Sequence, residues 1–255
     1  MNDPGDTRPH ELAGLRVLVT GGASGIGHAV AAAALARGAR VAVLDLDPAT
    51  APDGALGVAG DVTDDVSVNA AVERAAATLE GLDVLVNNAG IGAQGNVEAN
   101  PLDEWHRVFD VNVLGVVRVT RAALPHLRTS PYAAVVNMCS IAATAGLPDR
   151  ALYSASKGAV LSLTLAMAAD HLHEGIRVNC VNPGTTDTPW IDRLLDRASD
   201  PAAERAALEA RQPSGRLVRP QEVAAAVLHL AAPSAGATTG TSLAVDGGMA
   251  GLRVR

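Results

Sequence analysis

Short apolar runs alternate with alanine-rich stretches along almost the whole chain, and this alternation limits the possible folds more than any other feature. The runs are nearly continuous in apolar character, which is typical of strands buried on both faces of a sheet. They predict strands at 16–20, 40–45, 55–61, 82–88, 133–140, 176–184 and 241–248. The stretches between them predict helices at 25–37, 66–80, 102–128, 151–173 and 220–231. Repetition of strand and helix implies a parallel sheet with right-handed crossovers.

The length of 255 residues is ordinary for one α/β domain, and neither an internal repeat nor a linker divides the chain. We therefore expect residues 1–255 to form one domain, a doubly wound parallel sheet of seven strands with helices on both faces. Residues 185–219 interrupt the pattern, because they are long, follow a strand and contain Pro189, Pro201 and Pro213. This segment is predicted to form a partly helical lid over a substrate site.

Composition excludes several classes of function. The net charge of −7 argues against a nucleic acid or an anionic membrane as the main partner, and 2% aromatic residues leave little for base stacking. The first fourteen residues lack the apolar core of a signal peptide, and we expect no apolar run long enough to span a membrane. Cys139 and Cys180, the only cysteines, form no disulfide framework and have no zinc-site spacing. We expect a reduced, cytoplasmic protein that binds no metal, nucleic acid or membrane.

The sequence TGGASGIG, Thr20–Gly27, connects the first predicted strand to the first predicted helix. Its glycines Gly21, Gly25 and Gly27 allow a tight turn and a close approach of the backbone to a pyrophosphate at a helix N-terminus. A tight turn without a ligand is the alternative interpretation. The spacing G-x-x-x-G-x-G differs from the common G-x-G-x-x-G pattern, but the physical argument is the same.

Asp45 ends the next predicted strand, 18 residues after Gly27. A carboxylate there accepts hydrogen bonds from both ribose hydroxyls of an adenosine, and it repels a 2′-phosphate. Because no Lys or Arg lies within Gly21–Gly27 to offset that repulsion, the sequence favours NAD over NADP. The alternative for Asp45 is an ordinary turn or capping aspartate.

The sequence YSASK contains the only lysine, Lys157, beside nineteen arginines. Tyr153 and Lys157 are four residues apart on a predicted helix and therefore share a face. A phenol of pKa about 10 needs roughly 4 kcal/mol of help to give up its proton near neutral pH. One positive charge at ~4 Å supplies about that much at an effective dielectric near 20. An ammonium suits the task because it is compact and directs several donors at once, whereas the alternative is a solvated surface lysine.

Five motifs occur in order along the chain: TGGASGIG, NNAG at Asn87–Gly90, Ser140, Tyr153-x-x-x-Lys157 and NPG at Asn182–Gly184. Together they resemble the short-chain dehydrogenase/reductase family, over nearly the whole chain. The resemblance implies a Rossmann-like fold and an NAD-dependent hydride transfer between a secondary alcohol and a ketone. It also implies a homotetramer built on the helices at 112–128 and 151–173 and on the C-terminal strand.

The resemblance implies a role for each matching residue. Tyr153 would be the general base in oxidation and the acid in reduction, and Ser140 would hydrogen-bond the reacting oxygen. Lys157 would activate the tyrosine and hold the nicotinamide ribose, and Asn112 would anchor a proton-relay water. Contact with NAD is implied for Gly21, Ser24, Gly25, Ile26, Gly27, Asp45, Asp61, Val62, Asn88, Ala89, Gly90, Tyr153, Lys157, Pro183, Gly184, Thr186 and Thr188. Taken singly, Asn112 is equally a helix N-cap, Asn88 a turn residue and Ser140 a turn hydroxyl.

Three arginines are candidates for binding substrate, because arginine binds carboxylates in a bidentate way. Arg150 lies three residues before Tyr153, whereas Arg193 and Arg211 lie in the predicted lid with Trp190. The sequence around them is similar to a subgroup of the family that includes 2-keto-3-deoxy-sugar-acid dehydrogenases and a cytosolic 3-hydroxybutyrate dehydrogenase. A hydroxy acid or sugar acid is therefore the favoured substrate, and a neutral sugar or polyol is the alternative. A non-catalytic NAD sensor on the same fold is the rival class, since fold alone does not give function.

Overall fold

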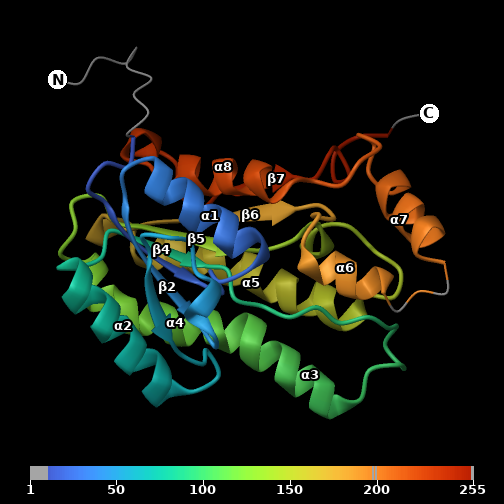
Figure 1. Ribbon diagram of the computed structural model, residues 1–255, viewed down its shortest axis with the longest axis horizontal. Helices are drawn as coiled ribbons and strands as arrows, with labels where there is room; N and C mark the ends of the chain where they lie inside the picture. The colour runs from blue at the N-terminus through green and yellow to red at the C-terminus, as the bar shows by residue number, and fades with distance from the viewer. Residues whose placement is uncertain (1–10, 197, 199, 254–255) are drawn as a thin grey trace.

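The computed structural model describes residues 11–196, 198 and 200–253. These residues form a parallel sheet of seven strands with helices on both faces (Figure 1). The strands are β1 Arg16–Thr20, β2 Arg40–Asp45, β3 Leu56–Ala59, β4 Val84–Asn87, β5 Ala134–Met138, β6 Arg177–Pro183 and β7 Ser242–Val245. Their spatial order, β3-β2-β1-β4-β5-β6-β7, runs outward from β1 in one direction and from β4 in the other. The predicted Rossmann-like, doubly wound fold is confirmed.

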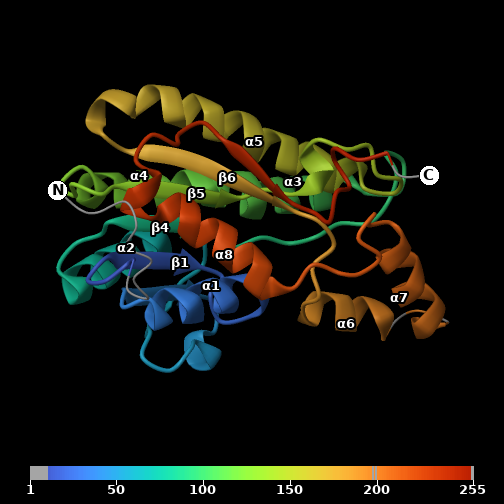
Figure 2. The ribbon, with the colours of Figure 1, turned by 90° about the horizontal axis from the view of Figure 1, so that it is seen from above.

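Most of the helices form a layer on each face of the sheet. The α-helices of the described residues are α1 Gly25–Ala36, α2 Asp65–Leu79, α3 Leu102–Phe109, α4 Gly115–Leu127, α5 Ala151–Asp170, α6 Pro189–Leu195, α7 Pro201–Ala210 and α8 Pro220–Ala231. Helices α1 and α8 lie side by side on one face, and α2, α4 and α5 cover the other (Figures 1 and 2). Helices α6 and α7 stand apart from both layers, beyond the carboxyl end of β6 (Figure 2).

The continuous apolar character of the strands follows from burial on both faces. In β1, Val17 and Val19 belong to the core cluster under α1 and α8, whereas Leu18 belongs to the cluster under α2, α4 and α5. Side chains alternate between the faces of a strand, so apolar residues are favoured on both faces of a central strand. The apolar pattern of the strands therefore indicates that helices cover both faces of the sheet.

Two predicted helices are interrupted in the structure. The helix expected at 102–128 is divided into α3 and α4 by a π-helical turn at Asp110–Leu114. The helix expected at 151–173 ends at Asp170, and Leu172–Glu174 form a short 3₁₀ helix. Strand ends also differ slightly, since β5 ends at Met138 and Ser140 therefore lies beyond the strand. These interruptions and shifted ends depend on tertiary contacts, and the local sequence preference for helix or strand does not predict them.

Helix α5 has the length and apolar composition of a membrane-crossing segment, contrary to the expectation that no apolar run would. Polar side chains on this helix are buried inside the protein, namely Ser156, Lys157 and Thr164. Thr164 accepts a hydrogen bond from Asn137 of β5 at 2.9 Å, so that face of α5 packs on the sheet. Length and composition alone therefore do not distinguish a membrane-spanning helix from the core helix of an α/β domain.

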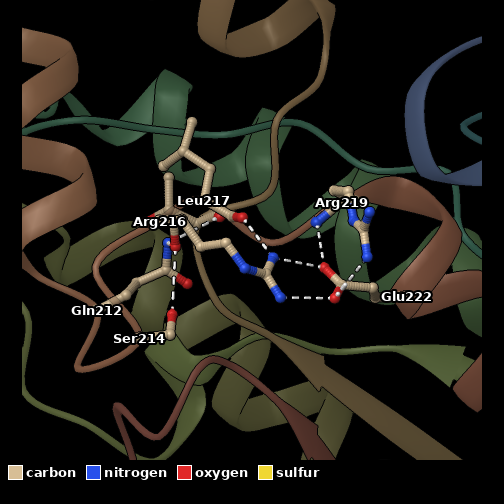
Figure 3. Close-up of polar contacts among 7 residues, drawn as sticks. Gln212, Ser214, Arg216, Leu217, Arg219 and Glu222 are labelled. Carbon is tan, nitrogen blue, oxygen red and sulfur yellow. Dashed lines mark hydrogen bonds and ion pairs between the residues drawn. The ribbon is translucent and has the colours of Figure 1, made fainter.

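The segment 185–219 is partly helical, as predicted, and contains α6 and α7. Its end is fixed to the N-terminus of α8 by Glu222, as Figure 3 shows. The Glu222 carboxylate accepts hydrogen bonds from both terminal nitrogens of Arg216, at 2.8 and 2.7 Å, and from the backbone N–H of Arg219 at 2.8 Å. Movement of this segment as a lid remains a prediction.

Candidate active site

A cavity of about 510 Å³ lies along the carboxyl ends of the strands, where connections from neighbouring strands diverge to opposite faces. Ligands of doubly wound sheets bind at this kind of position. All the predicted catalytic, cofactor and substrate residues line the cavity except Gly27 and Asn112. Residues from almost the whole length of the chain therefore meet in one crevice.

The glycine loop fits closely against the end of β4. Gly21 and Gly25 have φ of +63° and +55°, which favours glycine. A Cβ at Gly21 would lie 2.9 Å from Cα of Ala89, and a Cβ at Gly27 would collide with the carbonyl oxygen of Gly21. Gly27 thus lies beneath the loop rather than in the cavity, where it allows α1 to begin directly against the turn.

Thr20 and Asn88 join the ends of β1 and β4. The Thr20 hydroxyl accepts hydrogen bonds from the backbone N–H groups of Asn88 and Ala89, both at 3.0 Å. The Asn88 side-chain amide donates to the carbonyl oxygens of Thr20 and Gly21, also at 3.0 Å. Sequence reasoning assigned no role to Thr20. A hydroxyl that ends an apolar strand directly before a glycine loop is the signal that indicates one.

Two carboxylates line the end of the cavity formed by β2 and β3. An Asp45 oxygen accepts a hydrogen bond from the Ala23 N–H at 3.0 Å and so fixes this carboxylate beside the glycine loop. Asp61 accepts hydrogen bonds from the backbone and hydroxyl of Thr63, which hold the pKa of Asp61 below its ordinary value. Among the described residues, no Lys or Arg lines this end of the cavity.

Ser140, Tyr153 and Lys157 lie together near the middle of the cavity. Lys157 is 5% exposed, its Nζ donates to the Met138 carbonyl at 2.8 Å, and it lies 5.8 Å from the centroid of the Tyr153 ring. Ser140 begins the short 3₁₀ helix Ile141–Ala143, and its Oγ accepts from the Ala142 N–H at 3.1 Å. Its hydroxyl proton therefore points to another acceptor, and the cavity is one of the places open to it.

Asn112 lies in the π-helical turn, behind the cavity wall. Its Oδ1 accepts from the Ile91 N–H at 2.8 Å, and its Nδ2 donates to the Ile91 carbonyl at 2.9 Å and to Ser156 Oγ at 3.1 Å. Both amide protons are thus committed to protein groups. The side chain ties the segment after β4 to α5, and it is not a helix N-cap; the relay role of Asn112 stays a prediction.

The segment that follows β6 closes the cavity from the opposite side. Pro183, Gly184, Thr186 and Thr188 line it as predicted. Thr186 donates to the Gly184 carbonyl at 3.1 Å, and a Cβ at Gly25 would lie 3.6 Å from the Thr188 side chain. Thr188 therefore faces the glycine loop across the cavity.

The predicted substrate residues line the end of the cavity formed by α6, α7 and the turn before α5. Arg150 is partly buried, while Arg193, Arg211 and Trp190 are exposed at their outer parts. Burial first, and the like charge of Arg211 second, lower the pKa of Arg150 from its ordinary value, with Asp149, Tyr153 and Glu204 acting in the opposite direction. Arg150 still carries its charge. Among the described residues, none of these three arginines has a carboxylate within 4.0 Å.

Apolar side chains complete this end of the cavity, and sequence reasoning did not identify them individually. They are Ile141, Ala142, Leu147, Pro148, Ile191, Leu208 and Met249. The segment 185–219, predicted to form a lid, supplies Ile191 and Leu208, and the residues between β5 and α5 supply the others except Met249. Met249 comes from the chain after β7, so no local pattern connects it to the site.

Known proteins are similar to this chain over most of its length. A family model described as Enoyl-(Acyl carrier protein) reductase matches residues 21–250. A 2-(S)-hydroxypropyl-CoM dehydrogenase of Xanthobacter autotrophicus is 39% identical over 92% of this chain and 96% of its own length. A cis-4-hydroxycyclohexanecarboxylate dehydrogenase of Sinomonas cyclohexanicum is 43% identical over 91% of this chain and 94% of its own.

Among solved structures, the ligand-free aldohexose dehydrogenase of Thermoplasma acidophilum superposes with a TM-score of 0.90 at 32% identity. The match covers 97% of this chain and 100% of that chain. These relatives do not single out the sugar-acid subgroup that the sequence suggested. They do share one architecture and named dehydrogenase activities, and the chain therefore belongs to the short-chain dehydrogenase/reductase family.

Proposed function

We propose that this protein is an NAD-dependent dehydrogenase that oxidises a secondary alcohol bearing a carboxylate, a hydroxy acid or a sugar acid. The observation that carries the proposal is the order of charges along one cavity. Asp45 stands at one end, Tyr153 and Lys157 stand in the middle, and Arg150 and Arg211 stand at the other end. This order suits a dinucleotide whose adenosine ribose lies beside Asp45, together with a substrate whose anionic group lies beside Arg150 and Arg211.

The residues of the first end fit a dinucleotide. Gly21 and Gly25 line the cavity and have the positive φ of a tight turn, so the loop presents backbone without side chains at these two positions. Asp45 would accept the ribose hydroxyls, and Asp61 and Val62 would lie beside the adenine. A 2′-phosphate would meet carboxylates and, among the described residues, no basic side chain on the lining of this end. The proposal therefore favours NAD over NADP.

In the proposed mechanism, bound NAD⁺ supplies the hydride acceptor. Tyr153, as the phenolate, takes the proton from the substrate hydroxyl and becomes the phenol, and Ser140 donates a hydrogen bond to the same oxygen. The buried ammonium of Lys157 stabilises the phenolate form of Tyr153 before this transfer, because charges interact more strongly away from water. Asn112 hydrogen-bonds to both Ile91 and Ser156 and so connects the segment after β4 to α5. This connection helps to hold the α5 residues Tyr153 and Lys157 in position at the cavity.

The anionic substrate follows from the unpaired arginines. Burial first, and the like charge of Arg211 second, lower the pKa of Arg150. An anion beside Arg150 and Arg211 would offset both effects, and a carboxylate accepts from arginine in a bidentate way. The name of the Sinomonas relative contains a carboxylate, which is consistent with this substrate class. A neutral polyol offers no charge to these arginines, and this makes it the weaker candidate.

A substrate panel tests the proposal. Reduction of NAD or NADP would be followed by absorbance with hydroxy acids, sugar acids and polyols, the two cofactors side by side. We expect turnover with NAD and an acid, and at least a tenfold lower kcat/KM with NADP. Tight NAD binding without turnover on any compound would favour the rival interpretation, a non-catalytic NAD sensor.

We further propose a homotetramer. The exposed leucines Leu114, Leu165 and Leu172 lie on or beside α4 and α5, at 47%, 50% and 56% exposure. Strand β7 forms one edge of the described sheet. An exposed apolar helix face and an open edge strand are surfaces that a second copy covers well. Sedimentation velocity should give four times the 25.8 kDa chain mass, and a monomer would reject the assembly.

We also propose that the protein works in the cytoplasm. Both cysteines are free and buried, in agreement with a reducing compartment. The partners expected there are its small-molecule substrate and its own copies, rather than nucleic acid or a membrane. Localisation of a tagged full-length chain tests this, and export from the cell would contradict it.

A further inference from the structure

The substrate end of the cavity has a sharply divided lining. What we call the substrate wall comprises, among the described lining residues, three arginines and otherwise apolar side chains, namely Ile141, Ala142, Leu147, Pro148, Arg150, Trp190, Ile191, Arg193, Leu208, Arg211 and Met249. Ile141, Ala142, Leu147 and Pro148 come from the turn before α5, while Leu208 and Met249 come from α7 and the chain after β7. Among its described lining residues, the substrate wall has no carboxylate, amide or hydroxyl side chain.

Some of the nearby polar groups are committed elsewhere. Thr186 donates to the Gly184 carbonyl, and the Gln212 amide, which is 1% exposed, donates to the backbone carbonyls of Thr185 and Arg216. Thr185 and Thr188 also line the cavity, and their hydroxyls have no hydrogen-bond partner among the described residues, but they lie outside the substrate wall. The Gln212 Oε1 also has no partner there, but Gln212 does not line the cavity. On the substrate wall itself, hydroxyl groups elsewhere on a substrate would therefore find no side-chain acceptor among the described lining residues.

This lining discriminates between the two substrate classes that the proposed function leaves open. A sugar hydroxyl both donates and accepts hydrogen bonds, whereas arginine only donates. A hydroxyl buried against Leu147 or Met249 would lose its hydrogen bonds to water without replacement, which is unfavourable. A hydrocarbon body would gain from the same burial.

We infer that the substrate is an amphipathic hydroxy acid, with an anionic group held by Arg150 and Arg211 and a hydrocarbon body held by the substrate wall, rather than a polyhydroxylated sugar acid. The inference rests on the proposed function for the reacting centre and the anion. It adds the chemistry of the rest of the molecule, and it assigns Leu147 and Met249 as specificity-determining residues.

Four six-carbon probes separate the two statements, because they vary charge and body independently. They are 3-hydroxyhexanoate, gluconate, 2-hexanol and sorbitol, each assayed with NAD. We expect kcat/KM for 3-hydroxyhexanoate to exceed that for gluconate by 10- to 100-fold, since an apolar pocket rejects added hydroxyls only to about that extent. Equal or higher values for gluconate would overturn the inference.

The same panel shows which statement fails. Preference for 2-hexanol and sorbitol over both acids would reject the anionic substrate, while the comparison between 2-hexanol and sorbitol would still judge the hydrocarbon body. If none of the four is turned over, their dissociation constants measured by calorimetry with NAD present make the same comparison. Tighter binding of gluconate than of 3-hydroxyhexanoate would then reject the inference.

Variants test the residues themselves. Met249→Gln keeps side-chain length but adds an amide, so we expect the ratio of kcat/KM for 3-hydroxyhexanoate over gluconate to fall at least tenfold. Leu147→Asn, in a separate loop, should lower it in the same direction. Leu252→Gln is the matched control, because Leu252 lies in the same C-terminal segment, is exposed and does not line the cavity. An unchanged ratio in both Met249→Gln and Leu147→Asn would remove these residues from the substrate wall.

Discussion

The two ends of the cavity are built in different ways. The cofactor end, formed by Gly21–Gly27, Asp45, Asp61 and Asn88–Gly90, consists of strand ends that hydrogen-bond to one another through backbone and buried side chains. The substrate wall consists of segments outside the sheet, and it acts through the tips of side chains. A backbone cradle tolerates few changes, whereas a wall of side chains changes specificity without disturbing the fold. Fixed cofactor chemistry and adjustable substrate choice thus occupy one crevice.

The largest effect is expected where the two ends meet. Tyr153→Phe removes the only hydroxyl proposed to exchange a proton with substrate, so kcat should fall by about 10²- to 10⁴-fold. NADH affinity, measured by fluorescence, should change much less than kcat, because Tyr153 is one of many residues expected to contact the cofactor.

Tyr132→Phe is the control for this prediction. Tyr132 is the other tyrosine of the chain, is 50% exposed and does not line the cavity. We expect its kcat to equal that of the unmodified protein. Retention of turnover in Tyr153→Phe would reject the whole catalytic assignment, including the role of Lys157.

A smaller and more selective effect is expected in the substrate wall. Arg150→Met should raise KM for a hydroxy acid by about 10- to 100-fold, since a hydrogen bond to a charged group contributes roughly 1.5–3 kcal/mol. The KM for NAD should stay the same, which would sharpen the contrast between the two ends. Arg74→Met, on an exposed position of α2, provides the control. An unchanged KM for the acid would exclude Arg150 from the site.

The cofactor end should respond to a single methyl group. Gly27→Ala places a Cβ against the Gly21 carbonyl, and overpacking of this kind costs about 1–3 kcal/mol, or roughly 2–12 °C in Tm. NAD affinity should fall with it because the loop must shift. Gly158→Ala in α5, where an added Cβ has no neighbour within 4 Å, should not lower Tm. Equal Tm values for the two variants would contradict the rigid cradle.

The same contrast explains how much the sequence reveals. The sheet, the glycine loop and Asp45 were predictable because each depends on a local rule: strand periodicity, backbone freedom and the residue that ends a strand. Tyr153 and Lys157 were predictable as a pair because helical spacing places them on one face, whereas Ser140 was identified only through the resemblance to the family motifs. The structure brings all of them to one cavity as expected.

Non-local contacts account for what the sequence could not predict. The π-helical turn at Asp110–Leu114 accompanies hydrogen bonds between Asn112 and Ile91, which lie 21 residues apart. Met249 reaches the substrate wall only because the chain after β7 returns to the cavity. Likewise, the partial burial of Arg150 depends on how α6 and α7 are placed around it. None of these contacts can be predicted from a short stretch of sequence, because each joins residues that are distant along the chain.

The smallest effect is expected at the anchor of the segment 185–219. The hydrogen bonds from Arg216, followed by that from the Arg219 N–H, hold the pKa of Glu222 well below its ordinary value of 4.5. A carboxyl group with a lowered folded-state pKa stabilises the fold above its unfolded pKa, and that contribution disappears as pH falls through the folded-state pKa. Because these groups are exposed, Glu222→Gln should lower Tm at pH 7 by no more than about 3 °C.

The pH dependence of Tm tests whether the charge of Glu222 is responsible. The difference in Tm between the Glu222→Gln variant and the unmodified protein should shrink below pH 4. The control is Glu98→Gln, an exposed position without an ion pair among the described residues, which should show no such pH dependence. A Tm difference that stays constant from pH 7 to pH 3 would show that the hydrogen-bond geometry of Glu222, and not its charge, anchors the segment beside the substrate wall.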